Sequence, residues 1–167
     1  MNLRTYSLAA VLTAVVAAGC LQPPEYPVEP VLTYVGISSD TMLQGSVTED
    51  SVRVFLSFTD GDGDVSPAAN DSVSNFFLEN IRTGETVTDF ATDPIPEEGA
   101  ENGISGEISL RVFTTCCDYP DFVVAFPCTP SDQYPIDTLD LEAYMVDRAG
   151  NESNRVRIDP IYLICNR

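Results

Sequence analysis

Apolar residues in this chain recur at every second position, which is the spacing of a strand with one buried face. Val52, Val54, Leu56 and Phe58 give the clearest case, and the segment Leu139–Val146 repeats it. Similar segments span 31–37, 76–81, 85–90, 104–114, 122–126 and 155–164. No segment shows the apolar stripe of an amphipathic helix. About seven or eight short strands, separated by Gly, Pro and Asp turns, predict an all-β chain folded as one two-sheet sandwich.

Turn residues predict where some of these strands end or distort. Arg82-Thr83-Gly84 falls between two strand segments and predicts a hairpin tip. Pro160 lies inside the final segment. Because proline cannot donate a ladder hydrogen bond, it predicts an edge or bulged strand there.

Five cysteines are present, and Cys20 stands apart from the other four. An even number of cysteines outside the cytoplasm indicates disulfides. A bond between adjacent Cys116 and Cys117 would close a strained ring, so we expect each to pair with either Cys128 or Cys165. Side chains of neighbouring strand residues point to opposite faces, which leaves both of these pairings open. A four-thiolate zinc site is the alternative, although the sequence lacks a C-x-x-C knuckle.

The N-terminus has the pattern of an export signal. Arg4 precedes a short apolar run from about Tyr6 to Val16, and the small residues 17–19 lead to Cys20. The run is shorter than the roughly 20 residues that span a bilayer. This pattern resembles bacterial lipoprotein signals, with Ala17 where that family prefers Leu. The resemblance implies that residues 1–19 are removed and that Cys20 carries the lipid, palmitate included.

Residues 20–30 follow as a linker between the lipidated cysteine and the folded domain. Four prolines in this segment predict an extended, semi-stiff spacer, so the sandwich is expected over residues 31–167. Leu21 occupies the position where an Asp commonly retains lipoproteins in the inner membrane. The sequence therefore favours an outer-membrane location, facing either the cell surface or the periplasm.

The charge balance and the missing residue types exclude several functions. The chain has 26 acidic and 8 basic residues, and its net charge of −18 predicts no nucleic-acid partner. It has no histidine, which excludes Ser-His-Asp and Cys-His sites and zinc enzymes with imidazole ligands. We therefore expect no enzymatic activity, and a two-carboxylate hydrolase is the formal alternative.

Asp60-Gly61-Asp62-Gly63-Asp64 is the segment with the clearest chemistry. Three carboxylates alternate with glycines directly after a strand, and hard oxygen ligands with this spacing suit Ca²⁺. With Asp60 counted as position 1, Asp71 falls at position 12, so the loop partly resembles EF-hand and dockerin loops. Val65 at position 6 and Pro67 at position 8 depart from that pattern. The alternative is a solvated acidic turn whose side chains cap their own backbone.

The segment from Tyr144 to Asn154 contains Asp-Arg-Ala-Gly-Asn and resembles the end of the penultimate strand in bacterial immunoglobulin-like and fibronectin-III-like domains. The resemblance implies a Greek-key sandwich, and Gly150 and Asn151 suit backbone positions with positive φ. In that topology the loops after the second and the penultimate strands lie at the same end. Asp147, or the side-chain oxygen of Asn151, could then complete a calcium site with the aspartate loop.

The order of these two motifs resembles small surface lipoproteins of the Bacteroidetes type. The resemblance implies a calcium-stabilised, non-enzymatic binding or assembly module whose loops contact an envelope protein or a glycan. A structural accessory subunit of an outer-membrane complex is one alternative. A carbohydrate-binding module is another, with Tyr119, Phe122 and Tyr134 as its exposed rings. Those rings could equally pack over the edge of the sandwich.

Overall fold

The computed structural model describes residues 25–46, 49–68, 71, 73–93, 95, 103–120 and 127–167. Its described part is all-β and contains no helix. The strands are β1 (Val31–Ile37), β2 (Thr41–Leu43), β3 (Ser51–Asp60), β4 (Phe76–Asn80), β5 (Thr86–Phe90), β6 (Ile104–Phe113), β7 (Ile136–Leu139), β8 (Leu141–Met145), β9 (Val156–Arg157) and β10 (Ile161–Ile164). The expected signal, the lipidated Cys20 and the strand expected over 122–126 lie outside the described residues.

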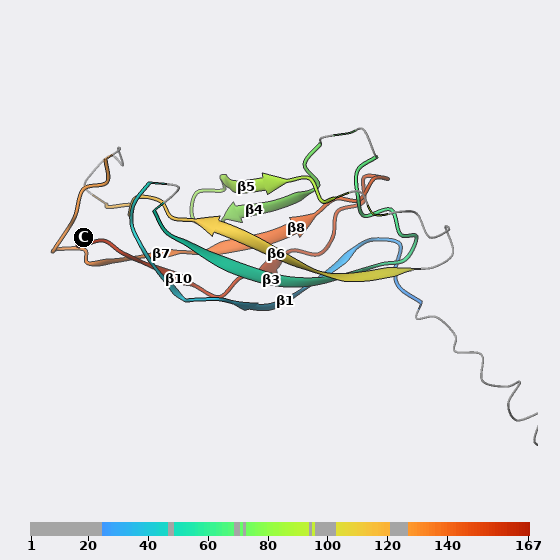
Figure 1. The fold of residues 1–167 in the computed structure, drawn as a ribbon, viewed down its shortest axis with the longest axis horizontal. Helices are drawn as coiled ribbons and strands as arrows, with labels where there is room; N and C mark the ends of the chain where they lie inside the picture. Colours follow the sequence, from blue (N-terminus) through green and yellow to red (C-terminus); the bar gives the residue numbers. More distant parts are fainter. Residues whose placement is uncertain are drawn as a thin grey trace, which may run out of the picture.

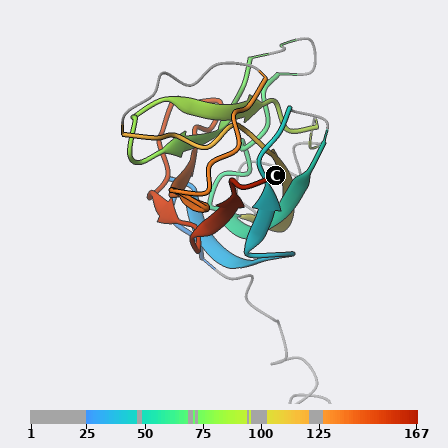
Figure 2. The same ribbon diagram turned by 90° about the vertical axis from the view of Figure 1, so that its left-hand side faces the viewer.

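The strands form two packed layers, seen end-on in Figure 2 with the green β4–β5 hairpin above the blue and teal strands β1 and β3. One layer is the antiparallel sheet β1-β3-β6, and the other contains β5-β4-β8-β9. A third small sheet, β2-β10-β7, continues the second layer, because only Asp140 separates β7 from β8. The antiparallel pair therefore runs from β8–β9 into β7–β10.

This strand order is that of an immunoglobulin-like sandwich. β1, β3 and β6 hold the places of strands A, B and E, whereas β5, β4, β8 and β9 hold those of C′, C, F and G. The short strand β2 pairs in parallel with β10, so the chain crosses from one layer to the other between β1 and β2. The all-β sandwich predicted from the alternating pattern is confirmed.

The core lies between the two layers and is built from the alternating residues. Val52, Val54, Leu56 and Phe58 of β3 are all buried. They face the apolar side of β8, where the buried residues are Leu141, Ala143 and Met145. Each buried Val, Leu, Phe or Met side chain contributes about 1.5–3 kcal/mol of burial free energy relative to an exposed position. A shift of either strand by one residue would expose its whole apolar face, so the pattern fixes the register.

Two of the four predictions at turns are confirmed. Arg82-Thr83-Gly84 forms the turn between β4 and β5, with Gly84 at φ 70°, and Gly150 has φ 93°. The single edge or bulged strand expected over 155–164 is wrong: Pro160 lies in a break that divides it into β9 and β10, and β10 lies between β2 and β7. The positive φ expected at Asn151 is wrong: this residue keeps a negative φ, and both its backbone N–H and its side-chain amide donate to Asp147.

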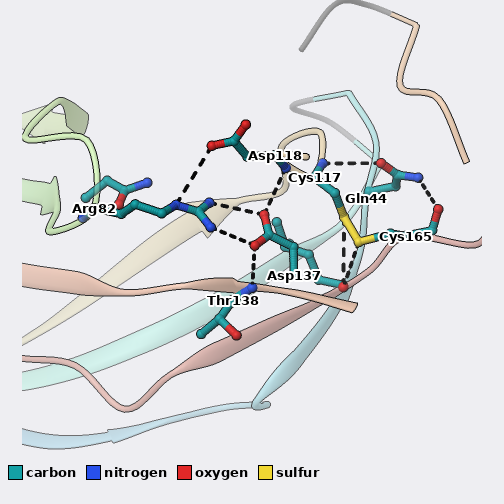
Figure 3. Close-up of polar contacts among 9 residues, drawn as sticks. Gln44, Arg82, Cys117, Asp118, Asp137, Thr138 and Cys165 are labelled. Atoms are coloured by element: carbon teal, nitrogen blue, oxygen red, sulfur yellow. Dashed lines mark hydrogen bonds and ion pairs between the residues drawn. A yellow bond between two sulfur atoms is a disulfide. The ribbon is translucent and has the colours of Figure 1, made fainter. Parts of the chain in front are cut away.

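Two disulfides hold the end of the sandwich where the chain terminates. Cys116 bonds to Cys128, and Cys117 bonds to Cys165, which decides between the two pairings that the sequence left open. The side chain of Gln44 bridges the second bond, accepting from the Cys117 N–H and donating to the Cys165 carbonyl (Figure 3). Strand β10 is thereby attached to the segment that follows β6.

An ion pair lies beside this disulfide. Both terminal nitrogens of Arg82 donate to Asp137, at 2.7 and 3.1 Å, and the backbone N–H groups of Asp118 and Thr138 donate to the same carboxylate (Figure 3). Burial alone would raise the pKa of Asp137, but these hydrogen bonds and the guanidinium charge lower it. The contact connects the β4–β5 turn to the start of β7.

Candidate metal centre

The opposite end of the sandwich, on the right in Figure 1, gathers the loop after β3, the turn after β8 and the N-terminal segment of the described chain. Asp60 is the last residue of β3, and Asp147 follows β8 in the other sheet. The expectation that these two loops share one end of the fold is confirmed. This arrangement brings carboxylates from both layers together.

Asp60, Asp64 and Asp147 form the acidic group. Each offers one carboxylate oxygen, and these oxygens lie within 4.8 Å of one another. Two ligands on opposite sides of one Ca²⁺ ion, each at about 2.4 Å, would be about 4.8 Å apart. The spacing therefore fits oxygens that share a single cation. Asp60 is fully buried and Asp147 is 5% exposed, so bulk water screens little of their mutual repulsion.

Backbone hydrogen bonds fix the loop in this shape. One oxygen of Asp60 accepts from the N–H groups of Gly63 and Asp64, at 2.8 and 3.1 Å. The Asp64 carbonyl accepts from the N–H of Arg148, and its carboxylate accepts from the N–H of Ala149. The β8–β9 turn is therefore hydrogen-bonded directly to the aspartate loop.

One carboxylate oxygen of each loop aspartate lacks a hydrogen-bond partner among the described residues. The Oδ1 atoms of Asp60, Asp62 and Asp64 are buried without a hydrogen-bond partner in the described structure. A buried carboxylate oxygen with no donor carries its full desolvation cost, which a bound cation would remove. This is the observation that distinguishes the loop from an ordinary solvated acidic turn.

The pKa values of Asp60 and Asp64 are raised by the same burial and crowding of carboxylates. Burial, with smaller contributions from the charges of Asp62 and Asp64, raises the pKa of Asp60 to about 6, against the opposing hydrogen bonds from the loop backbone. Burial and the charges of Asp147 and Asp62 raise the pKa of Asp64. In the absence of a cation, burial and crowding therefore disfavour the charged forms of Asp60 and Asp64.

The remaining expected ligands take other positions. Asp62 presents its buried Oδ1 but does not belong to the group of three. Asp71 is exposed and lines a pocket of about 170 Å³ that also borders Asp147. Asn151 acts through its amide, which donates to Asp147 Oδ2 at 2.8 Å and orients that carboxylate.

Val65 explains why this loop departs from the EF-hand pattern. It is fully buried in the core, and its carbonyl accepts a 2.7 Å hydrogen bond from the Asn75 side chain. The chain therefore turns into the sandwich at the position where an EF-hand continues around its ion. Asp147 follows strand β8 of the other sheet and supplies the third carboxylate of the acidic group from that layer.

The rings of Tyr119 and Tyr134 do not form the exposed aromatic surface expected for a carbohydrate-binding module. Tyr119 is only 7% exposed, its ring stacks on Tyr134 at 5.8 Å, and its hydroxyl donates to the Thr129 carbonyl. The alternative of packing at the edge of the sandwich is confirmed for this pair. Phe122 lies outside the described residues.

Within the part of the chain that the structure describes, no helix has the length and apolar character needed to cross a membrane. Comparison with protein-family models, with curated proteins and with solved structures returned no match for this chain.

Proposed function

We propose that this protein is a lipid-anchored, non-enzymatic module of the cell envelope whose binding end is stabilised by Ca²⁺. The observation that carries the proposal is the acidic group of Asp60, Asp64 and Asp147, with buried carboxylate oxygens that lack donors. All-oxygen, carboxylate-rich sites suit Ca²⁺, which accepts six to eight ligands in flexible geometry. The ion would join the loop of one sheet to the turn of the other.

Two further features support an envelope location and a structural role for the ion. Two disulfides are typical of proteins that mature in an oxidising compartment, in keeping with the export signal expected before Cys20. The acidic group is largely sealed, with Asp60 fully buried, which suits a held ion better than a substrate that must enter and leave.

Thermal unfolding of the purified full chain tests the calcium proposal. We expect the melting temperature to rise on titration with Ca²⁺ and to fall with a chelator. Asp147→Asn should abolish the rise. Asp71→Asn is the matched control and should preserve it, because Asp71 is exposed and outside the acidic group. An identical melting curve with calcium and with chelator would rule the ion out.

Metabolic labelling with a palmitate analogue tests the anchor separately. The expressed chain should incorporate the label and fractionate with outer membranes, whereas Cys20→Ser should remain unlabelled. Labelling that persists in the Cys20→Ser variant, or its absence from the wild-type chain, would contradict lipidation at this residue.

A further inference from the structure

The outer face of the β1-β3-β6 sheet carries two arginines side by side. Arg53 of β3 and Arg111 of β6 are register partners in the antiparallel ladder, and both are exposed. Like charges placed directly opposite each other destabilise a sheet. The chain nevertheless brings two of its few cations together at this point.

Neither guanidinium is neutralised by a carboxylate among the described residues. Arg53 donates to the Ser109 hydroxyl at 3.2 Å, and Arg111 lies 5.9 Å from the centroid of the Phe113 ring. The arginines on the other sheet behave differently: those at 82, 155 and 157 each form ion pairs with acidic side chains. In a chain with 26 acidic residues and 8 basic ones, this pair forms a local cationic site.

Exposed phenyl rings flank the arginines on a diagonal. Phe55 follows Arg53 by two residues along β3, and Phe113 follows Arg111 by two along β6, so both rings share the face of the arginines. Because the strands run antiparallel, the rings lie on opposite sides of the pair, about 13 Å apart along the strands. They are 38% and 40% exposed. These four residues are called the arginine–phenylalanine patch below.

The size of the patch limits what can occupy it. Its three rows of residues on two strands cover about 200 Å². A stable protein partner usually buries about 800 Å² on each side. Glu107, two rows from Arg111 on the same face, places a carboxylate at the boundary of the patch. The area therefore suits a small ligand better than a folded protein.

The patch also lies away from the acidic group of Asp60, Asp64 and Asp147. β3 begins near Arg53 and ends at Asp60, seven residues later. Charges beyond about 8 Å are largely screened at physiological salt, so the acidic end contributes little to the potential at the patch.

We propose that the arginine–phenylalanine patch binds an anionic oligosaccharide. A guanidinium can hold a carboxylate or a sulfate ester with two parallel N–H bonds, and the phenyl rings offer flat apolar faces to the C–H faces of sugar rings. Ser109 adds a hydroxyl beside Arg53. The assignment adds a ligand-binding face to the proposed envelope module. This face lies apart from the calcium-stabilised end and does not depend on calcium.

Binding of defined oligosaccharides to the full chain in detergent tests this assignment. The probes are oligogalacturonate, a sulfated chondroitin oligosaccharide, and an uncharged malto-oligosaccharide of equal length. We expect one or both acidic probes to bind and the uncharged probe not to bind, with affinity falling as salt rises. Whichever acidic probe binds more tightly identifies a carboxylate or a sulfate as the preferred anion.

Substitutions at the patch provide the second arm of the test. Arg53→Gln and Arg111→Gln should each weaken binding about tenfold, equivalent to about 1.4 kcal/mol. Neither should lower the melting temperature, because each relieves a like-charge contact. Arg157→Gln is the matched control: its guanidinium is also exposed but lies on β9 in the other sheet, and binding should be unchanged.

Three outcomes would overturn the proposal: no acidic probe binds, the Arg53→Gln/Arg111→Gln double variant binds as well as the wild type, or a polyglutamate peptide binds as tightly as the sugars. The last result would indicate an acidic protein segment as the ligand. None of them would affect the calcium-dependent melting or the palmitate labelling, so failure here is distinguishable from failure of the proposed function.

Discussion

Asp64 and Asp147 offer carboxylate oxygens within 4.8 Å of each other although the two residues lie 83 positions apart and follow strands of different sheets. The fold therefore holds two negative charges together across the open end of the sandwich. The N–H groups of Arg148 and Ala149, which donate to Asp64, close the same junction. A cation here would act as a cross-link between layers.

Asp60→Asn should change stability in opposite directions with and without calcium. In chelator, the substitution removes a buried charge that repels its neighbours, so the melting temperature should rise by a few degrees. In excess Ca²⁺ it removes a ligand, so the variant should melt below the wild type. Scanning calorimetry in both buffers measures the two signs. A variant that melts lower in both buffers would mean that the charge is already compensated.

The aspartate loop also contacts the N-terminal segment at Gly61. A β-carbon added there would lie 2.4 Å from the Tyr26 carbonyl oxygen and 2.6 Å from that of Pro27, and both are backbone atoms with little freedom to move. Gly61→Ala should cost about 1–3 kcal/mol of unfolding free energy and release the segment from the loop. Urea unfolding measures the cost, and protease cleavage near Tyr26 measures the release.

Gly36→Ala is the control for this prediction. A β-carbon at Gly36 would meet no atom within 4 Å, so crowding should cost nothing there. Equal stabilities of the two alanine variants would show that the N-terminal segment does not lie on the loop as described.

The two disulfides should contribute unequally to stability. They close segments of 12 and 48 residues, and chain entropy then assigns about 3 kcal/mol to the Cys116–Cys128 bond and about 4 kcal/mol to Cys117–Cys165. The double variant Cys117→Ser/Cys165→Ser should therefore lose more stability than Cys116→Ser/Cys128→Ser. Urea unfolding gives the ranking, and the reverse order would contradict the entropic account.

Much of the fold could be predicted because the alternating pattern shows directly which face of each strand is buried. Val31–Ile37 has the expected bounds, and β3 and β6 match within two residues. The three-residue strand β2 was missed because its register comes from a parallel pairing with β10, more than a hundred residues away. Sequence periodicity carries no information about such a partner.

The candidate site could be predicted only in part. Local spacing predicts Asp60, Asp62 and Asp64 as ligands, and an EF-hand-like count then points to Asp71 at position 12. Asp147 can be predicted only from the immunoglobulin-like topology, which places the two loops at one end of the sandwich. The disulfide pairing could not be predicted, because adjacent cysteines on an extended backbone can each reach either partner until the path of β10 is known.

The ion pair at the disulfide end gives the protein a defined sensitivity to acid. Asp137 has a lowered pKa in the folded state, so its stabilising contribution is present above the ordinary pKa of an aspartate. The contribution is lost as the pH falls through the lowered folded-state value. Stability should therefore decline below about pH 4 as the bonds from Arg82, Asp118 and Thr138 lose the carboxylate charge.

Asp137→Asn should remove this part of the acid sensitivity. The variant should lose about 1–3 kcal/mol at pH 7, because Arg82 loses a charged acceptor, and its unfolding free energy should vary less between pH 4 and pH 2. Asp132→Asn, at an exposed position of the same region, is the control and should follow the wild-type profile. Urea unfolding at each pH, in buffers depleted of divalent metal so that the acidic end stays free of cations, gives the two curves. Parallel curves for the Asp137→Asn variant and the wild type would place the acid sensitivity elsewhere in the chain.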